Sequence, residues 1–345
     1  MEIDDVRTQT EFKSESFSGY KKCDVKKELL ENLCKNKIEN CCHWTAELIC
    51  SGHYTELWEI ILLYFSKYIH SGNPKLAIYI EMRYTNFKDI LNNGYLGREL
   101  NMRNNDKIRK LFCEIICNLC LSTKKHSFEK IKIKKEDFDM TMFSEKLKAP
   151  NILYIKDIFT ENDPKEIYIA LNELAYNISI KNALQSCFWI EWILEFENIC
   201  NKKKEKCLGS YRTFMNVDNK YQNDIVWIIW QLIFSNVNNL QLDKIMKSLL
   251  NLFCIRYSYS IKRKRIYVLY YAITLCCEHI NYDIPLFRDK DIIENVCGNI
   301  NIIYKDIKKN EVSPNTDYLF DKVGKSNTEK TIERLEKMKE LDSFT

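Results

Sequence analysis

The stretch CCHWTAELICSGH, residues 41–53, gathers side chains of the types that bind zinc: Cys41, His43, Cys50 and His53. Cysteine thiolates and histidine imidazoles are the usual ligands of structural zinc, but such sites take them in two close pairs across a larger loop. Here a predicted helix separates the first pair from the second by more than one turn. We therefore predict no metal at these residues, and we assign the thiols to the core and the imidazoles to helix ends.

Two carboxylates, Glu191 and Glu195, stand four residues apart within the apolar stretch FWIEWILEFE. On one face of a helix such a pair can serve acid–base chemistry or a di-iron centre. The di-iron motif of helical bundles also needs a glutamate followed three residues later by histidine, and the chain has no such pair. We expect both carboxylates to pair with lysine or arginine from a neighbouring helix.

Two tryptophan pairs, Trp189/Trp192 and Trp227/Trp230, have the i, i+3 spacing of one helix face. An aromatic box for a ligand is one interpretation. Burial in the core is the preferred one, because indoles on long apolar helices bury large areas and fix helix packing. We predict that these two helices pack against each other.

Basic residues cluster in three segments, and the last of them is RYSYSIKRKRIYVLYY, residues 256–271, where tyrosines flank the cations. Lysine and arginine bind phosphates and tyrosine stacks on bases, so a nucleic-acid surface is possible if the fold joins the three segments. A solvated helix end is the simpler interpretation of any single segment. The candidate residues are Lys130, Lys132, Lys134, Lys202, Lys203, Lys204, Lys262, Arg263, Lys264 and Arg265.

The composition favours long helices joined by short loops. The 345 residues include only eight glycines and five prolines, too few for the turns of a β-sandwich or barrel. The formal net charge is +4, which gives no general attraction to nucleic acid or anionic membranes. No run of eighteen apolar residues exists, and the polar N-terminus lacks a signal peptide. An odd count of fifteen cysteines then predicts reduced thiols in a cytosol-like compartment. Cys113, Cys117 and Cys120 share one helix face and are assigned to the core.

The fold prediction depends on the positions of glycines at the expected helix ends. Helices over 39–49, 54–70 and 74–91 are expected to end at Gly52, Gly72 and the Asn93-Gly94 pair. Short loops make neighbouring helices antiparallel, so we predict an all-α fold of stacked helices, either repeat-like or a bundle. The alternation of lysine and isoleucine near 124–138 predicts a short extended or β insertion. Further helices are expected near 106–122, 186–207, 220–234, 240–256, 262–280 and 289–309.

Four parts are predicted along the chain: a disordered N-terminus at 1–22, helical parts at 23–149 and 150–312, and a linker with a charged terminal helix at 313–345. The second helical part is expected to pack on the first.

Several stretches resemble an uncharacterised protein family of the large nucleocytoplasmic DNA viruses of algae and protists. They are CHWTAELICSGHYTELWEIILLYFSKYIHSGNPKL, KKHSFEKIKIKKEDF, DPKEIYIALNELAY, FWIEWILEFENIC and KYQNDIVWIIW, within residues 40–235. The resemblance carries no activity, cofactor or catalytic residue. It implies a viral product of the host cytoplasm, used in the viral factory or the virion.

No glycine-rich phosphate loop, nucleophile elbow, zinc-protease motif or kinase signature occurs in the sequence. We therefore predict a protein that is not an enzyme, has no cofactor and acts as a scaffold or adaptor binding protein partners. An accessory DNA- or RNA-binding factor of viral replication or transcription is the alternative. An enzyme of an unrecognised all-α class is the third.

Overall fold

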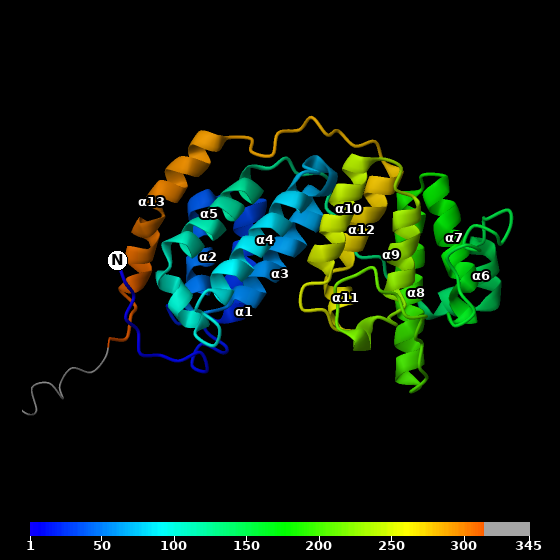
Figure 1. Cartoon of the computed structure of the whole chain (residues 1–345), viewed down its shortest axis with the longest axis horizontal. Coiled ribbons are helices and arrows are strands. Elements are labelled where there is room, and N and C mark those ends of the chain that lie inside the picture. Colours follow the sequence, from blue (N-terminus) through cyan, green and yellow to red (C-terminus); the bar gives the residue numbers. More distant parts are fainter. Residues whose placement is uncertain (314–345) are drawn as a thin grey trace, which may run out of the picture.

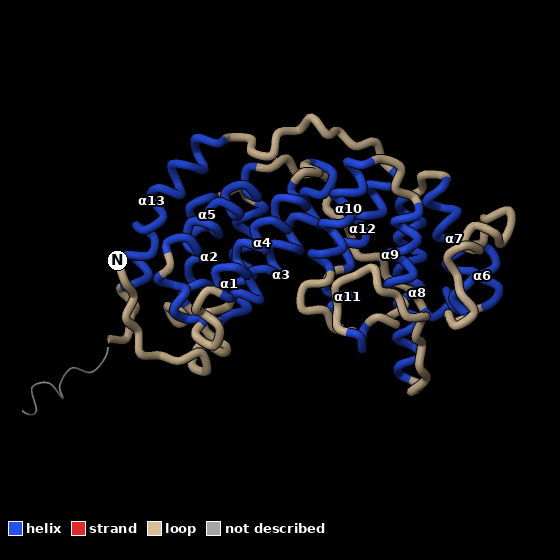
Figure 2. Tube along the Cα trace, in the orientation of Figure 1, coloured by secondary structure: helices blue, strands red, loops and turns tan. Residues whose placement is uncertain are grey.

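The computed structural model of the chain describes residues 1–313 and places them in an arch of helices (Figure 1). The backbone trace of this part consists of helices and loops (Figure 2), and its only β pairing is an isolated bridge between Glu15 and Lys21. The predicted all-α class is confirmed. Residues 1–313 include no helix with the length and hydropathy of a transmembrane segment. The predicted charged helix of the tail lies outside the described residues.

The first half of the arch contains the glycine-punctuated helices, and its elements are α1 (Lys22–Cys34), α2 (Ile38–Cys50), α3 (Tyr54–Tyr64), α4 (Leu76–Asn92) and α5 (Asp106–Leu121). Gly52 follows α2 with φ +73°, a conformation that only glycine adopts without strain. The helix expected to reach residue 70 instead changes pitch: a π-helical turn covers Phe65–Ile69 and a 3₁₀ turn covers His70–Gly72. Gly72 is required for space, since a Cβ there would lie 2.3 Å from the Thr123 carbonyl oxygen.

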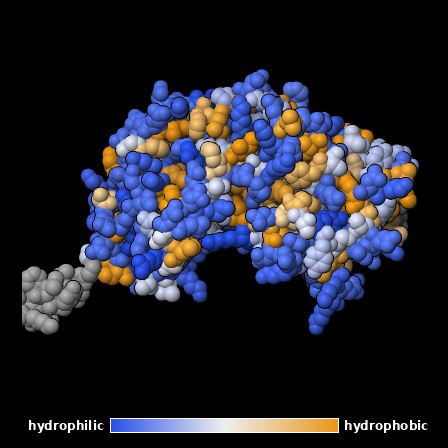
Figure 3. Space-filling model, in the orientation of Figure 1, coloured by the Kyte–Doolittle hydropathy of each residue, from blue (hydrophilic) through white to orange (hydrophobic). Residues whose placement is uncertain are grey.

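The second half contains α6 (Met140–Lys146), α7 (Tyr168–Ser179), α8 (Ala183–Lys202), α9 (Val226–Ser235), α10 (Leu240–Phe253), α11 (Ile261–Lys264) and α12 (Ile266–Cys277). Helices α7 and α8 form an antiparallel hairpin at one end of the arch, and α12 packs against α8 (Figure 1). The surface is hollowed along the lower edge between the two halves (Figure 3).

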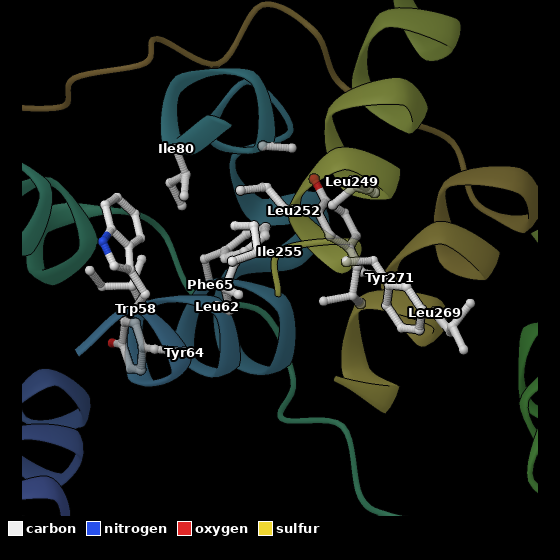
Figure 4. Packing of buried hydrophobic residues seen from close by; sticks show 14 of the residues in the cluster. Trp58, Leu62, Tyr64, Phe65, Ile80, Leu249, Leu252, Ile255, Leu269 and Tyr271 are labelled. Carbon is white, nitrogen blue, oxygen red and sulfur yellow. The ribbon is translucent and has the colours of Figure 1, made fainter. Parts of the chain in front are cut away.

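One continuous apolar core joins the halves. Helix α10 packs on α4, and α12 packs on the π-turn after α3. Figure 4 shows Phe65, Leu252 and Tyr271 from these elements gathered in one cluster, and all three are buried. The two predicted helical parts therefore share a core.

The last described helix, α13 (Lys290–Lys308), does not stay with the second half. The chain crosses the top of the arch after α12, and α13 returns to pack against α2 and α5 (Figure 1). Arg109 of α5 donates from Nη1 to the Asn301 side-chain oxygen at 2.9 Å, and its guanidinium lies 4.3 Å from the Tyr304 ring centroid. The division predicted at residue 150 thus differs from the packing, because residues 290–308 belong with the first half.

Residues 1–21 are ordered in the structure, whereas the sequence predicts them to be disordered. Phe12 and Phe17 are buried in the core. The Ser16 hydroxyl donates to the fully buried Glu47 carboxylate at 2.7 Å, and the Ser18 amide donates to it at 3.0 Å. The average composition of residues 1–21 is polar and does not reveal these few contacts. Each contact either satisfies a buried polar partner or buries an apolar side chain.

The predicted extended insertion is an arm that docks on the end of the π-turn rather than a strand of a sheet. The amide of Lys125 donates to the Tyr68 carbonyl at 2.9 Å and the amide of Phe128 to the Lys67 carbonyl at 3.1 Å. The Phe128 ring stacks on buried His70 at 4.3 Å, and His70 Nε2 lies 2.8 Å from the His126 carbonyl oxygen. Lysine and isoleucine alternate in this segment because one side of the arm faces the core.

The buried His70 makes folding sensitive to acid. Burial, reinforced by nearby His126 and Lys125 and opposed by the His126 carbonyl, lowers the pKa of His70 to about 4. The unfolded chain then binds a proton that the folded chain excludes, so stability falls as pH drops from about 6.5 towards about 4. At pH 5 we expect this histidine to cost about 2 kcal/mol of unfolding free energy relative to pH 7.

Urea unfolding at pH 7 and pH 5 measures this effect. His70→Asn should show a smaller pH 7-to-5 loss than the unmodified chain, because asparagine tolerates the positive φ of this position and does not titrate. The exposed His279→Asn is the matched control and should keep the full loss. Equal losses in all three proteins would contradict the assignment.

Candidate functional site

The basic stretch predicted at 262–265 begins with a buried cation. Lys262 is 2% exposed, and its ammonium lies 2.5 Å from Glu197 Oε1 and 2.8 Å from Asp224 Oδ1. Tyr257 also donates to the Asp224 carboxylate at 2.8 Å. Burial raises the pKa of Glu197, and the neighbouring Lys262 charge opposes that shift. Lys262 therefore neutralises two buried carboxylates instead of meeting solvent.

Two more cations of this stretch are used inside the protein. Arg265 is 3% exposed, pairs with Glu59 and donates to the Phe253 carbonyl at 2.8 Å. Arg263 is half-buried and pairs with Glu195 at 3.1 Å. Only Lys264 is exposed. The interpretation as a phosphate-binding surface is corrected for Lys262 and Arg265, because both cations are buried and would have to leave their carboxylate partners to reach a phosphate.

The remaining predicted cations are exposed. They belong to the arm and to the end of α8, and they are Lys130, Lys132, Lys134, Lys202, Lys203 and Lys204. Nucleic-acid binding stays a prediction that depends on these side chains and Lys264.

Glu191 and Glu195 do not converge on one centre. Glu195 pairs with Arg263, as the sequence predicts, whereas Glu191 is 4% exposed and accepts a hydrogen bond from Tyr270 at 2.8 Å. Burial raises the pKa of Glu191, and the Tyr270 hydrogen bond opposes the rise. Tyr270 also lines a cavity of about 490 Å³ between the arm, α8 and α12, with His126 at its edge.

The two tryptophan pairs are buried, as predicted, but they occupy separate clusters. Trp192 packs on Phe138 at 4.8 Å, whereas Trp230 packs on Phe253 at 5.5 Å. Helix α12 packs against both α8 and α9. The expectation that these two helices pair directly is not met, because each uses a different aromatic partner and α12 is their common neighbour.

The four potential zinc ligands within residues 41–53 also lie apart from one another. His53 Nε2 lies 3.0 Å from the Glu15 carbonyl oxygen, and His43 faces the surface between α2 and α13. Cys50 is fully buried and Cys41 lies beside Cys120. All fifteen cysteines lie in the described part of the chain and are free thiols there.

A different set of thiols does converge, and it includes the neighbouring Cys42. Its Sγ lies 4.0 Å from Cys113 Sγ and 3.9 Å from Cys117 Sγ, and the latter two are 4.0 Å apart. The three side chains are buried between α2 and α5. The i, i+4 spacing of Cys113 and Cys117 was the available sequence signal, but only the fold reveals that Cys42 faces them.

A groove with a volume of about 650 Å³ runs along the surface where α2 meets α13. Its apolar lining comes from Trp44 on α2 and from Val296, Ile300 and Ile303 on α13. Ile302 stands at its edge with 65% of its surface exposed. An apolar groove bordered by polar residues is typical of an interaction site.

Charged residues lie at both ends of this groove. Glu39 and Asn40 lie where α2 begins, and a second hollow of about 440 Å³ continues past His43 to Lys305 and to the ion pair of Lys309 with Asp306. Tyr20 extends the aromatic wall, since its ring meets Trp44 edge-on at 5.4 Å. The site therefore offers an apolar floor with Glu39 at one end and, at the other end, Lys305 beside a Lys309–Asp306 ion pair.

Comparisons with known proteins identify no relative. No family model, no curated protein and no solved structure matches the chain. Function must therefore be argued from the geometry of the residues themselves.

Removing the buried ammonium tests the assignment of Lys262. Lys262→Met keeps the volume but leaves Glu197 and Asp224 buried together without their cation, so we expect a loss of about 3–5 kcal/mol in unfolding free energy. Lys264→Met, at the exposed neighbouring cation, should change stability by less than about 0.5 kcal/mol. Urea unfolding measures both. A loss below about 1 kcal/mol for Lys262→Met would show that the ammonium is solvated and again available for phosphate.

Proposed function

We propose that the protein is a non-catalytic adaptor that binds an amphipathic helix of a partner protein in the groove between α2 and α13. The observation that carries this proposal is the exposed apolar groove with Trp44 in its wall and Ile302 at its edge. Helix-in-groove recognition places apolar side chains, spaced i, i+3, i+4 and i+7, into such a surface. Tryptophan in a partly desolvated wall is the residue type that most often dominates binding energy.

The charge pattern specifies the chemistry of the partner. A carboxylate near one end of the bound helix would lie over Lys305, since Lys309 is already paired with Asp306, and a basic residue near the other end would face Glu39. Such complementary charges at the rim fix orientation and speed association more than they add affinity. The occupant is therefore a helix with an apolar stripe, an acidic end and a basic end.

The biological setting that we propose is the cytoplasm of a cell infected by a large nucleocytoplasmic DNA virus, in the viral factory or the virion. The resemblance within residues 40–235 supports this setting. So does the thiol content, because fifteen free cysteines suit a reducing compartment.

A selection from a library of random helical peptides tests the adaptor proposal with a defined probe. Selected peptides should share the i, i+3, i+4, i+7 apolar spacing and an acidic end. Their affinity for Ile302→Glu should fall at least tenfold, about 1.4 kcal/mol, because a carboxylate would be desolvated against the apolar stripe.

Leu240→Glu is the matched control for this measurement. Leu240 is 81% exposed on α10, away from the groove, so the same substitution there should leave peptide affinity unchanged. Peptides that bind the unmodified chain and Ile302→Glu equally would refute the groove as the binding surface. A library that yields no binder would also refute it.

A further inference from the structure

The thiols of Cys42, Cys113 and Cys117 have the spacing of ligands around one metal ion. Zinc binds thiolate sulfur at about 2.3 Å, so the sulfur atoms of a tetrahedral site lie about 3.8 Å apart. The three Sγ–Sγ distances are 3.9, 4.0 and 4.0 Å. These distances are almost twice the S–S bond of a disulfide, which is about 2.05 Å. The three sulfurs therefore form one face of a thiolate tetrahedron.

A fourth thiol stands beside this face. Cys297 of α13 is half-buried and neighbours the Cys113 thiol, although it stands outside the close group formed by the other three sulfurs. Helix α13 packs on both α2 and α5, the helices that carry the other three sulfurs. Two helices thus bring three thiols together, and a third helix places Cys297 beside them as the candidate fourth ligand, although the residues are up to 255 positions apart in the sequence.

We propose that Cys42, Cys113, Cys117 and Cys297 bind one Zn²⁺ ion as a structural tetrathiolate site. This site differs from the rejected set at 41–53, and it takes ligands from α2, α5 and α13 rather than from one loop. A tetrahedral sulfur environment selects zinc or iron, and the short sulfur spacing fits a single ion. A closed set of four protein ligands is the arrangement of structural zinc.

The proton balance of binding follows from the thiols. Zinc binds the thiolate form of cysteine, so each ligand loses its proton when the metal binds. Burial and the neighbouring sulfurs raise the pKa of Cys113. Zinc binding at four cysteines would form four Zn–S bonds and release the thiol protons to solvent, with no change of oxidation state.

Metal binding would also stabilise the return of α13. One ion would tie α13 to α2 and α5, the two helices on which it packs. The ordinary alternative is that the thiols pack as small apolar side chains. The two explanations differ in a measurable way, since packed thiols have no reason to bind one metal ion per chain.

The first experiment uses the full chain, expressed with zinc, purified under reducing conditions without chelator and analysed for bound metals. We expect about one zinc per chain. Exchange with Co²⁺ should give sulfur-to-cobalt charge-transfer absorption and the intense visible bands of tetrahedral cobalt. A folded protein that contains no stoichiometric metal and shows no cobalt–thiolate absorption would overturn the proposal. Iron in place of zinc in this assay would overturn the identity of the ion.

Variants locate the ligands. Cys117→Ser should lower zinc affinity at least tenfold, and Cys297→Ser should weaken the cobalt–thiolate absorption because one sulfur is lost. Cys187→Ser, at a buried thiol of α8 outside the cluster, should keep both signals. Unchanged zinc affinity in Cys117→Ser, or equal loss in Cys187→Ser, would contradict the assignment. If a variant does not fold, the metal content and cobalt spectrum of the unmodified chain still decide. This result is independent of the peptide selection, since zinc needs no partner.

Discussion

The return of α13 to the first half of the arch is the constraint on which the other features depend. Without α13, the apolar groove would have no second wall and the Cys113 face of α5 would be open to solvent. Arg109 stabilises this contact through two interactions: its hydrogen bond to Asn301 and the stacking of its guanidinium on the Tyr304 ring. In proteins most of a helix's stability comes from packing of its apolar face, so α13 owes its stability to this docking surface.

The segments on both sides of α13 help to fix it. Before the helix, the crossing chain is held where the Asn73 side chain donates to the Leu286 carbonyl at 3.1 Å and Tyr79 meets Phe287 at 5.4 Å. After the helix, the amide of Val312 donates to the Asp5 carboxylate at 2.9 Å. The N-terminal residues therefore have a structural role: they secure the end of α13 against the core. This role also explains why a polar segment is ordered.

The local features of the fold could be predicted from the sequence, whereas its long-range pairings could not. Glycine and apolar spacing place α2 and α5 within one residue of their observed ends, because helix ends depend on nearby residues. The burial of Lys262 was missed, since it depends on Glu197 and Asp224, 65 and 38 positions away. The composition likewise does not predict that Phe12 and Phe17 anchor the N-terminal segment in the core. The Cys113–Cys117 spacing indicated part of the thiol cluster, but Cys42 joins it only through tertiary packing.

Amide hydrogen exchange of residues 290–308 in the full chain is the most direct measurement of the central claim. Because an undocked helix of this length frays in water, slow exchange reports docking rather than helix propensity. We predict that the inward-facing turns around Ile300 and Tyr304 exchange as slowly as the buried turns of α2 and α5. Exchange of the whole segment at the rate of an unprotected peptide, while α2 and α5 remain protected, would contradict the account.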